Sequence, residues 1–150
     1  MDPSFRPAQA GDVPLVLRLM QGFYRDTSTP LDPLAARSAL AALVADPALG
    51  RVLVIELGAE PAGYVVLSLG FSLEFLGRDA FVDELYVVPE HRGRGLGRAA
   101  IRELESVAAG LGVKALHLEV GPDNESAKGL YRRAGFEDRR HRLMTKLLPR

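Results

Sequence analysis

The stretch that most constrains the fold of this chain is a glycine- and arginine-rich turn, Arg92-Gly93-Arg94-Gly95-Leu96-Gly97-Arg98. It follows a strand-like run over residues 80–88 that Pro89 closes, and it opens a helix-like run from Leu96 to Leu111. Glycines allow the backbone to approach a ligand closely, and the first N–H groups of a helix have no partner within the helix. The helix dipole adds about half a positive charge at the same end. The turn therefore predicts a site for a phosphate-bearing molecule.

Two common nucleotide-binding loops do not fit this turn. A Rossmann fingerprint with glycines at 93 and 95 requires a third glycine at the position of Arg98. A Walker A loop requires Gly-Lys-Ser or Gly-Lys-Thr, which the turn lacks. The pattern that remains is Arg-x-x-Gly-x-Gly over Arg92–Gly97. Taken alone, it also fits a tight strand-to-helix turn with solvated arginines.

Composition excludes several classes of function. The 19 basic and 19 acidic residues give a formal net charge of zero, which does not support a nucleic-acid or membrane-surface role. The chain has no cysteine, and its three histidines show no metal-ligand spacing, so we expect no disulfide, no thiol nucleophile and no metal. The first residues lack the apolar core of a signal peptide, and no apolar run approaches the ~20 residues of a membrane span. A cytoplasmic location and no membrane partner are the resulting expectations.

Hydrophobic periodicity predicts a mixed α/β domain in which helices pack on a central sheet. The elements expected, in chain order, are a strand at 5–8, helices beginning at Asp12 and Asp32, strands at 52–57, 64–69 and 80–88, a helix over 96–111, a strand at 115–120, a short helix capped by Asn124 or Ser126 that runs through Arg133, and a last strand at 142–148.

A second motif follows the strand expected at 115–120. It runs from Asn124 through Tyr131 to Gly135-Phe136. Together with Leu85–Gly97, it resembles the GNAT superfamily of acyl-CoA-dependent N-acetyltransferases. The segment 85–97 is similar to the pyrophosphate-binding motif of that family, and the segment 124–136 is similar to its strand–Asn–helix–Tyr–Gly-Phe motif. The opening Phe5–Val13 and the hairpin at 61–64 also resemble the family, so the resemblance covers nearly the whole chain.

The resemblance implies a fold and a cosubstrate. The fold is α+β within the broad α/β class: one N-acetyltransferase domain over residues 1–150, with a mixed, mostly antiparallel central sheet of six to seven strands and about four flanking helices. The implied cosubstrate is acetyl-CoA, and the acceptor is a small-molecule amine or a peptide such as a protein N-terminus. The family is often dimeric, so a homodimer is one expected oligomeric state, and the sequence leaves that state open.

The resemblance also implies which residues contact the cofactor. Backbone N–H groups of residues 93–98 suit a pyrophosphate, and the arginines of the turn can add charge-assisted hydrogen bonds. In the family, the backbone N–H at the position of Val87 holds the acetyl carbonyl, which would act as a one-donor oxyanion site. The alternative for Val87 is a residue that only packs in the strand, and the two roles are compatible. The implied cofactor contacts are Leu85, Tyr86, Val87, Arg92, Gly93, Arg94, Gly95, Leu96, Gly97, Arg98, Asn124, Ala127 and Tyr131.

Three residues are candidates for catalysis. Tyr131 is the candidate general acid that protonates the departing thiolate, with packing of the short helix as the alternative. Asp83 and Glu84 are the candidate bases, and as strand neighbours they face opposite sides unless a bulge intervenes. Polyamine acetyltransferases of the superfamily carry a Glu-Asp pair at the matching place, and here the order is reversed. The interpretation slightly favours Asp83, directly or through a water, with Glu84 next, and solvation of an exposed strand face is the alternative for each.

These inferences predict an N-acetyltransferase that moves an acetyl group from acetyl-CoA to a primary amine by direct nucleophilic attack, without a covalent enzyme intermediate. A non-catalytic acyl-CoA-binding sensor or regulatory module is the alternative, and a nucleotide-binding domain is disfavoured by Arg98. The sequence does not identify the acceptor. In the family, the segments that border the acceptor pocket match Phe23, Tyr24, Asp26, Glu74 and Phe75 here, and their aromatic and acidic mix suits a small cationic amine.

Overall fold

A five-stranded sheet forms the centre of the first of two compact units, residues 1–119. The structure is a computed structural model that describes residues 1–150. The strands lie across the sheet in sequence order. They are β1 (Pro3–Pro7), β2 (Gly50–Leu57), β3 (Glu60–Ser72), β4 (Gly77–Val87) and β5 (Ala115–His117). Strands β1 to β4 pair antiparallel and β5 pairs parallel to β4, so the sheet is mixed and mostly antiparallel, as predicted.

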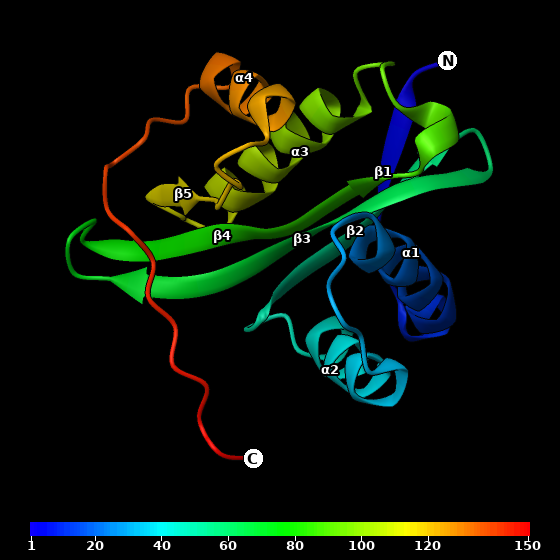
Figure 1. The fold of residues 1–150 in the computed structure, drawn as a ribbon, viewed down its shortest axis with the longest axis horizontal. Helices are drawn as coiled ribbons and strands as arrows, with labels where there is room; N and C mark the ends of the chain where they lie inside the picture. The colour runs from blue at the N-terminus through cyan, green and yellow to red at the C-terminus, as the bar shows by residue number, and fades with distance from the viewer. The chain divides into compact units, whose positions relative to one another are not determined.

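Helices cover both faces of this sheet. Helices α1 (Val13–Asp26) and α2 (Pro33–Ala45) lie on one face, and α3 (Leu96–Gly110) lies on the other (Figure 1). The chain also has two 3₁₀ turns. The first, η1 (Ala10–Asp12), leads into α1, and the second, η2 (Pro89–His91), follows β4. A helix layer on each side allows the inner strands to be apolar on both faces, which is why residues 52–55 and 62–67 are continuously buried.

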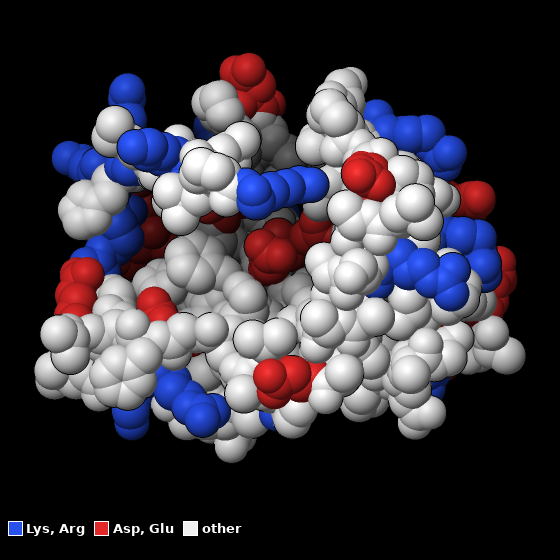
Figure 2. All heavy atoms as spheres, turned by 90° about the horizontal axis from the view of Figure 1, so that it is seen from below, with Lys and Arg blue, Asp and Glu red and all other residues white.

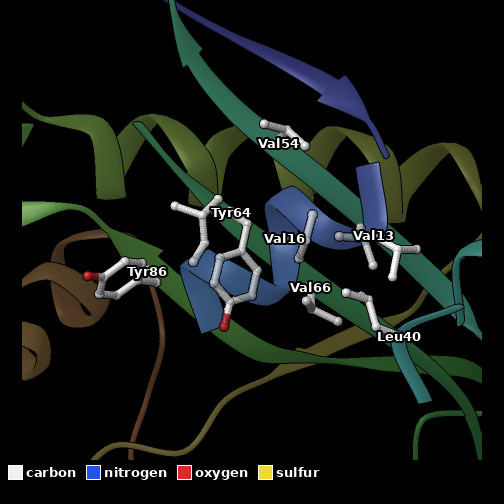
Figure 3. Close-up of a cluster of buried hydrophobic side chains, with 9 residues drawn as sticks. Val13, Val16, Leu40, Val54, Tyr64, Val66 and Tyr86 are labelled. Carbon is white, nitrogen blue, oxygen red and sulfur yellow. The ribbon is translucent and has the colours of Figure 1, made fainter. Parts of the chain in front are cut away.

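The core under α1 and α2 ends at the site described below. Val13 and Val16 of α1 and Leu40 of α2 pack over alternate residues of the sheet (Figure 3). The sheet contributes Val52, Val54, Tyr64, Val66 and Tyr86 to this layer. The intervening residues of β2 and β3, such as Leu53 and Val65, are equally buried but belong to the opposite face, as the period of two requires.

The second unit, residues 120–150, contains one helix, α4 (Glu125–Arg133). Of the two caps expected, Asn124 and Ser126, it is Asn124 that caps the helix, since its side chain accepts a hydrogen bond from the Ala127 N–H at 3.1 Å. The four α-helices therefore match the expectation. No helix of the chain is long and apolar enough to cross a membrane. Acidic and basic side chains are interspersed on the face shown in Figure 2, which fits the balanced composition.

The prediction of six to seven strands is wrong, because the sheet has five. The strand expected at 142–148 does not form: the segment has no ladder partner, and Leu143, Met144, Leu147 and Leu148 are exposed. Strand propensity describes how side chains fit a half-buried pleated surface, and a segment without such a neighbour gains nothing from it.

Asp12 stands at the N-cap position predicted for α1, but its carboxylate does not cap that helix. It instead accepts hydrogen bonds from the Arg6 guanidinium at 2.8 and 3.1 Å and from the Gln9 N–H at 2.7 Å. Arg6 also donates to Glu56 at 3.0 Å, so the cluster connects β1, β2 and the entry to α1. The hydrogen bonds from Arg6, and then that from Gln9, hold the pKa of the Asp12 carboxyl below its ordinary value.

We predict that Asp12→Asn lowers the free energy of unfolding by about 1–2 kcal/mol at pH 7, because it removes charge-assisted hydrogen bonds from a partly exposed pair. A carboxyl with a lowered pKa in the folded state stabilises the protein above its unfolded pKa of about 3.9, and this stabilisation is lost as pH falls through the folded pKa. Urea unfolding from pH 7 to pH 3 should therefore show the two proteins converging at the acid end. Asp2→Asn, at an exposed position without a charged partner, is the control, and a difference that does not shrink as the pH falls would contradict the assignment.

Candidate active site

The glycine turn has the backbone of an open anion-binding loop. Gly93 and Gly95 have φ angles of 75° and 80°, in the left-handed region that favours glycine. Gly95 is the N-cap of α3 and provides no side-chain hydrogen bond to the first N–H groups of the helix. A Cβ built at either glycine would meet no protein atom within 4 Å. The glycines are therefore needed for the conformation of the loop, and the space around them is open to a ligand.

The three arginines of the loop differ in what they contact. The side chains of Arg94 and Arg98 are exposed and have no partner in the protein. Arg92 is engaged: its Nε donates to the Val87 carbonyl at 2.9 Å, and a terminal nitrogen donates to the Asp26 carboxylate at 2.5 Å. Two free guanidinium groups therefore flank the open backbone of the loop.

Two leucines of this segment, Leu85 and Leu96, were also predicted as cofactor contacts. Leu96 is 3% exposed and belongs to the core under α3. Leu85 lies opposite Val65 in the β3–β4 ladder, on the same face of the sheet. Because Leu96 is buried, a cofactor contact from that position would come from its peptide group, whereas Leu85 is only partly buried.

A β-bulge in β4 determines the direction of Glu84. In the β3–β4 ladder Leu67 pairs with Val82 and Val66 pairs with Glu84, so Asp83 is an extra residue without a partner in β3. The bulge breaks the alternation of faces, and Glu84 joins Tyr64 and Val66 on the face that α1 and α2 cover. The strand alternation predicted that Asp83 and Glu84 face opposite sides unless a bulge intervenes, and the structure has such a bulge.

Two tyrosines hold the carboxylate of Glu84. The Tyr24 hydroxyl of α1 donates to one oxygen at 2.5 Å, and the Tyr64 hydroxyl of β3 donates to the other at 2.8 Å. Glu84 is partly buried and has no basic partner, whereas Asp83 is exposed and makes no hydrogen bond. The arrangement is a partly desolvated carboxylate that two neutral donors orient.

Burial raises the pKa of the Glu84 carboxyl above its ordinary value. The hydrogen bonds from Tyr24 and Tyr64 act in the opposite direction, and the nearby Asp83 carboxylate adds to the rise. Burial, followed by the contact with Glu84, raises the pKa of both tyrosine hydroxyls, so they stay protonated as donors. A carboxylate with a raised pKa is a stronger base than a solvated one.

Strand β4 leads from this carboxylate, through η2, to the glycine-rich loop of residues 92–98. Glu84 lies three residues before Val87, the last residue of β4, which corresponds to about 10 Å along an extended strand. The parallel ladder with β5 covers only Asp79–Phe81, so the edge of β4 beyond Phe81 is not paired with β5. Tyr86 lies between the two ends of the site, with its ring 5.9 Å from that of Phe23 and 5.5 Å from the Arg92 guanidinium carbon.

The second motif forms its own local structure in residues 120–150. The Tyr131 and Phe136 rings pack edge to face with centroids 6.0 Å apart, and the Phe136 N–H donates to the Tyr131 carbonyl at 3.0 Å. Gly135 has a φ of 93°, which explains the glycine before Phe136. Burial raises the pKa of the Tyr131 hydroxyl, which keeps it in the protonated form that an acid requires. The cofactor contacts expected of Asn124 and Ala127 remain predictions.

Sequence reasoning missed two features of the site. The hydroxyl of Tyr64 was not recognised as a partner of Glu84, and Arg92 was assigned to phosphate alone although it binds Asp26. Tyr24 and Asp26 were noted only as residues bordering the acceptor pocket. No local pattern reveals these pairs, because each joins residues that are distant in sequence. No group of three or more His, Cys, Asp or Glu side chains in the structure could hold a metal ion.

Comparison with known proteins identifies the family. The sequence pattern of the Acetyltransferase (GNAT) family matches residues 16–136, and the chain belongs to this family. An integron cassette protein from the mobile metagenome of Cole Harbour Salt Marsh has a solved structure with a TM-score of 0.87 and 42% identity, and the match covers 97% of this chain and 91% of that one.

Two curated relatives match a shorter region. Thialysine N-epsilon-acetyltransferase of Bos taurus is 34% identical over 89 residues, which are 57% of this chain and 52% of the relative. N-alpha-acetyltransferase RimI of Mycobacterium tuberculosis is 42% identical over 84 residues, which are 53% of this chain and 50% of the relative. The match thus spans about half the length of these relatives.

Proposed function

We propose that this chain is an acetyl-CoA-dependent N-acetyltransferase that transfers the acetyl group to a primary amine by direct attack. The observation that carries this proposal is the placement of two chemically different sites on one strand. β4 carries the oriented carboxylate of Glu84 and continues, after η2, into the open loop of residues 93–98. The family to which the chain belongs, and two relatives named for acetylation of an amine, support the same reaction.

The donor half of the proposed site is the loop with the first turn of α3. Its backbone N–H groups and the free guanidinium groups of Arg94 and Arg98 suit a pyrophosphate, because both kinds of donor form charge-assisted hydrogen bonds with phosphate oxygens. Acetyl-CoA supplies a thioester, which an amine can attack without an enzyme nucleophile. The backbone N–H of Val87 is the proposed donor to the acetyl oxygen.

The acceptor half centres on Glu84. An amine is mostly protonated at neutral pH, so the carboxylate of Glu84 accepts its proton, directly or through a water, before or during the attack. We favour Glu84 over Asp83 as the base because Glu84 is partly buried, oriented by two donors and raised in pKa, while Asp83 is exposed. Asp83 acts on it as a neighbouring negative charge. The phenol of Tyr131 is the proposed acid that protonates the leaving thiolate.

We also propose that the two units form one N-acetyltransferase domain over residues 1–150. The family match runs from residue 16 to residue 136 and crosses the boundary between residues 119 and 120. The proposed acceptor is a small-molecule amine or a peptide amine, in keeping with the relatives named for thialysine and for α-amino groups.

Titration calorimetry with acetyl-CoA, followed by a screen of primary amines for thiol release, tests the proposed function. We expect acetyl-CoA to bind, and we expect Arg94→Gln combined with Arg98→Gln to weaken this binding about tenfold or more, since two charge-assisted contacts are removed. Arg102→Gln, at an exposed position of α3 beyond the first turn, is the matched control and should bind normally. No binding would disprove the proposal, and tight binding without thiol release for any amine would favour the sensor role.

We predict that Glu84→Gln lowers kcat by about 10²–10⁴-fold with little change in the affinity for acetyl-CoA, because the amide keeps the shape but accepts no proton. Asp83→Asn should retain most of the activity. It removes a charge that raises the pKa of Glu84, so the acid limb of the kcat profile should move to lower pH. Steady-state rates between pH 5 and pH 10 measure both effects. A loss of rate in Asp83→Asn as large as in Glu84→Gln would assign the base to Asp83.

We predict that Tyr131→Phe lowers kcat about tenfold to a hundredfold and leaves the dissociation constant of acetyl-CoA within about threefold, since only the hydroxyl is removed and the ring contact with Phe136 is retained. Single-turnover rates with a saturating amine separate chemistry from product release. An acetyl donor with a more acidic thiol needs less protonation and should recover part of the lost rate. An unchanged kcat would leave Tyr131 with a packing role only.

A further inference from the structure

The last turn of α1 contacts Glu84 and Tyr86 of β4 and Arg92 of the loop that follows it. Tyr24 donates to Glu84, and Asp26 accepts from Arg92. Gly22 lies so close to Tyr86 that a Cβ there would come within 2.5 Å of the tyrosine hydroxyl oxygen, and Phe23 packs edge to face on the same ring. A shift of this turn would therefore move the donor to Glu84 and the partner of Arg92 together.

Arg92 is the only arginine of the loop that joins the loop to this turn. Its side chain donates to the Val87 carbonyl at 2.9 Å and to Asp26 at 2.5 Å, and its guanidinium lies 5.5 Å from the centre of the Tyr86 ring. These contacts come from β4 and from α1. The Arg92 side chain is about half exposed, but with two acceptors and an aromatic neighbour it is less free to turn toward a phosphate than Arg94 and Arg98, which have no partner.

We propose that the Asp26–Arg92 pair is a positioning element for the acceptor half of the reaction: it holds the last turn of α1 against the end of β4 and thereby keeps the Tyr24 hydroxyl on Glu84. In this proposal Arg92 lies in the loop, but its side chain helps to position the base. Arg94 and Arg98 bind the cofactor. The inference rests on the proposed role of Glu84 as the general base.

The groups that face Glu84 determine how the loss of the Asp26–Arg92 pair would change the pKa of Glu84. They are Tyr24 from α1, Tyr64 from β3 and Asp83 from β4. If the turn of α1 moves away, Glu84 loses the Tyr24 hydrogen bond, which lowers its pKa, and also part of the burial, which is the largest cause that raises it. The acid limb of the pH profile should then shift, which a general loss of stability would not cause.

Asp26→Asn, Arg92→Gln and the double variant test the proposal at saturating acetyl-CoA. We expect each single variant to lower kcat/KM for the amine about fivefold and to shift the acid limb, and the double variant to be no worse than either single one, because both changes remove the same interaction. Asp26→Glu should restore part of the activity. Arg25→Gln, an exposed position in the same turn, is the matched control and should leave kcat/KM within about twofold.

The outcome that would overturn the proposal is an Asp26→Asn enzyme with unchanged acceptor kinetics, or one that weakens acetyl-CoA binding as strongly as the Arg94→Gln and Arg98→Gln changes do. Hydrogen exchange provides a readout that does not depend on activity. The Thr27 and Thr29 N–H groups donate to carbonyls of α1 at 3.1 and 2.8 Å. Their exchange should accelerate in Asp26→Asn and Arg92→Gln and not in Arg94→Gln. If no amine is acetylated but this pattern holds, the structural link between α1 and the loop stands, while the proposed function fails.

Discussion

The extra residue in β4 is the constraint on which the rest of the site depends. In a regular ladder, residue 84 would share a face with Val82, whose partner Leu67 lies on the side of α3. The bulge at Asp83 places Glu84 opposite Val66 instead, on the side where Tyr64 and α1 lie. Everything that makes Glu84 a candidate base follows from this change of face: its burial, its two hydroxyl donors and its distance from any basic side chain.

The surroundings of Glu84 differ from those of a structural carboxylate in the same unit. Asp12 is paired with Arg6, and the hydrogen bonds from that guanidinium lower its pKa, so it stays charged and holds β1 to the entry of α1. Glu84 has only neutral donors. Burial without an opposite charge raises its pKa, and the two tyrosine hydroxyls satisfy its oxygens without removing its capacity to accept a proton. The difference between Arg and Tyr as partners separates a stabilising carboxylate from the one proposed as the general base.

The sequence predicted the parts of the molecule that local chemistry determines. The loop was predicted because glycine at 93 and 95 has a local cause, a positive φ at the start of a helix. Most helices and strands were found from their periodicity, and Asn124 as a cap from its side chain. The direction of Glu84 was not predictable, because a bulge depends on the register with β3. The strand expected at 142–148 failed for a related reason, since strand formation requires a partner that local propensity does not specify.

The three arginines of the loop belong to one motif, but their surroundings in the structure differ. In the sequence they are equivalent, since each adds one charge near a helix N-terminus. In the structure, Arg92 follows the end of β4 closely enough to bond the Val87 carbonyl, and Asp26 at the end of α1 fixes its other nitrogen. Arg94 and Arg98 lie further along, where no carboxylate reaches them. If phosphate charge is met mainly by the latter two and by backbone N–H groups, then Arg92 is free to connect the loop to the helix that orients the base. The Asp26–Arg92 contact would then connect the donor half to the acceptor half, and a change in either half would affect the other through α1.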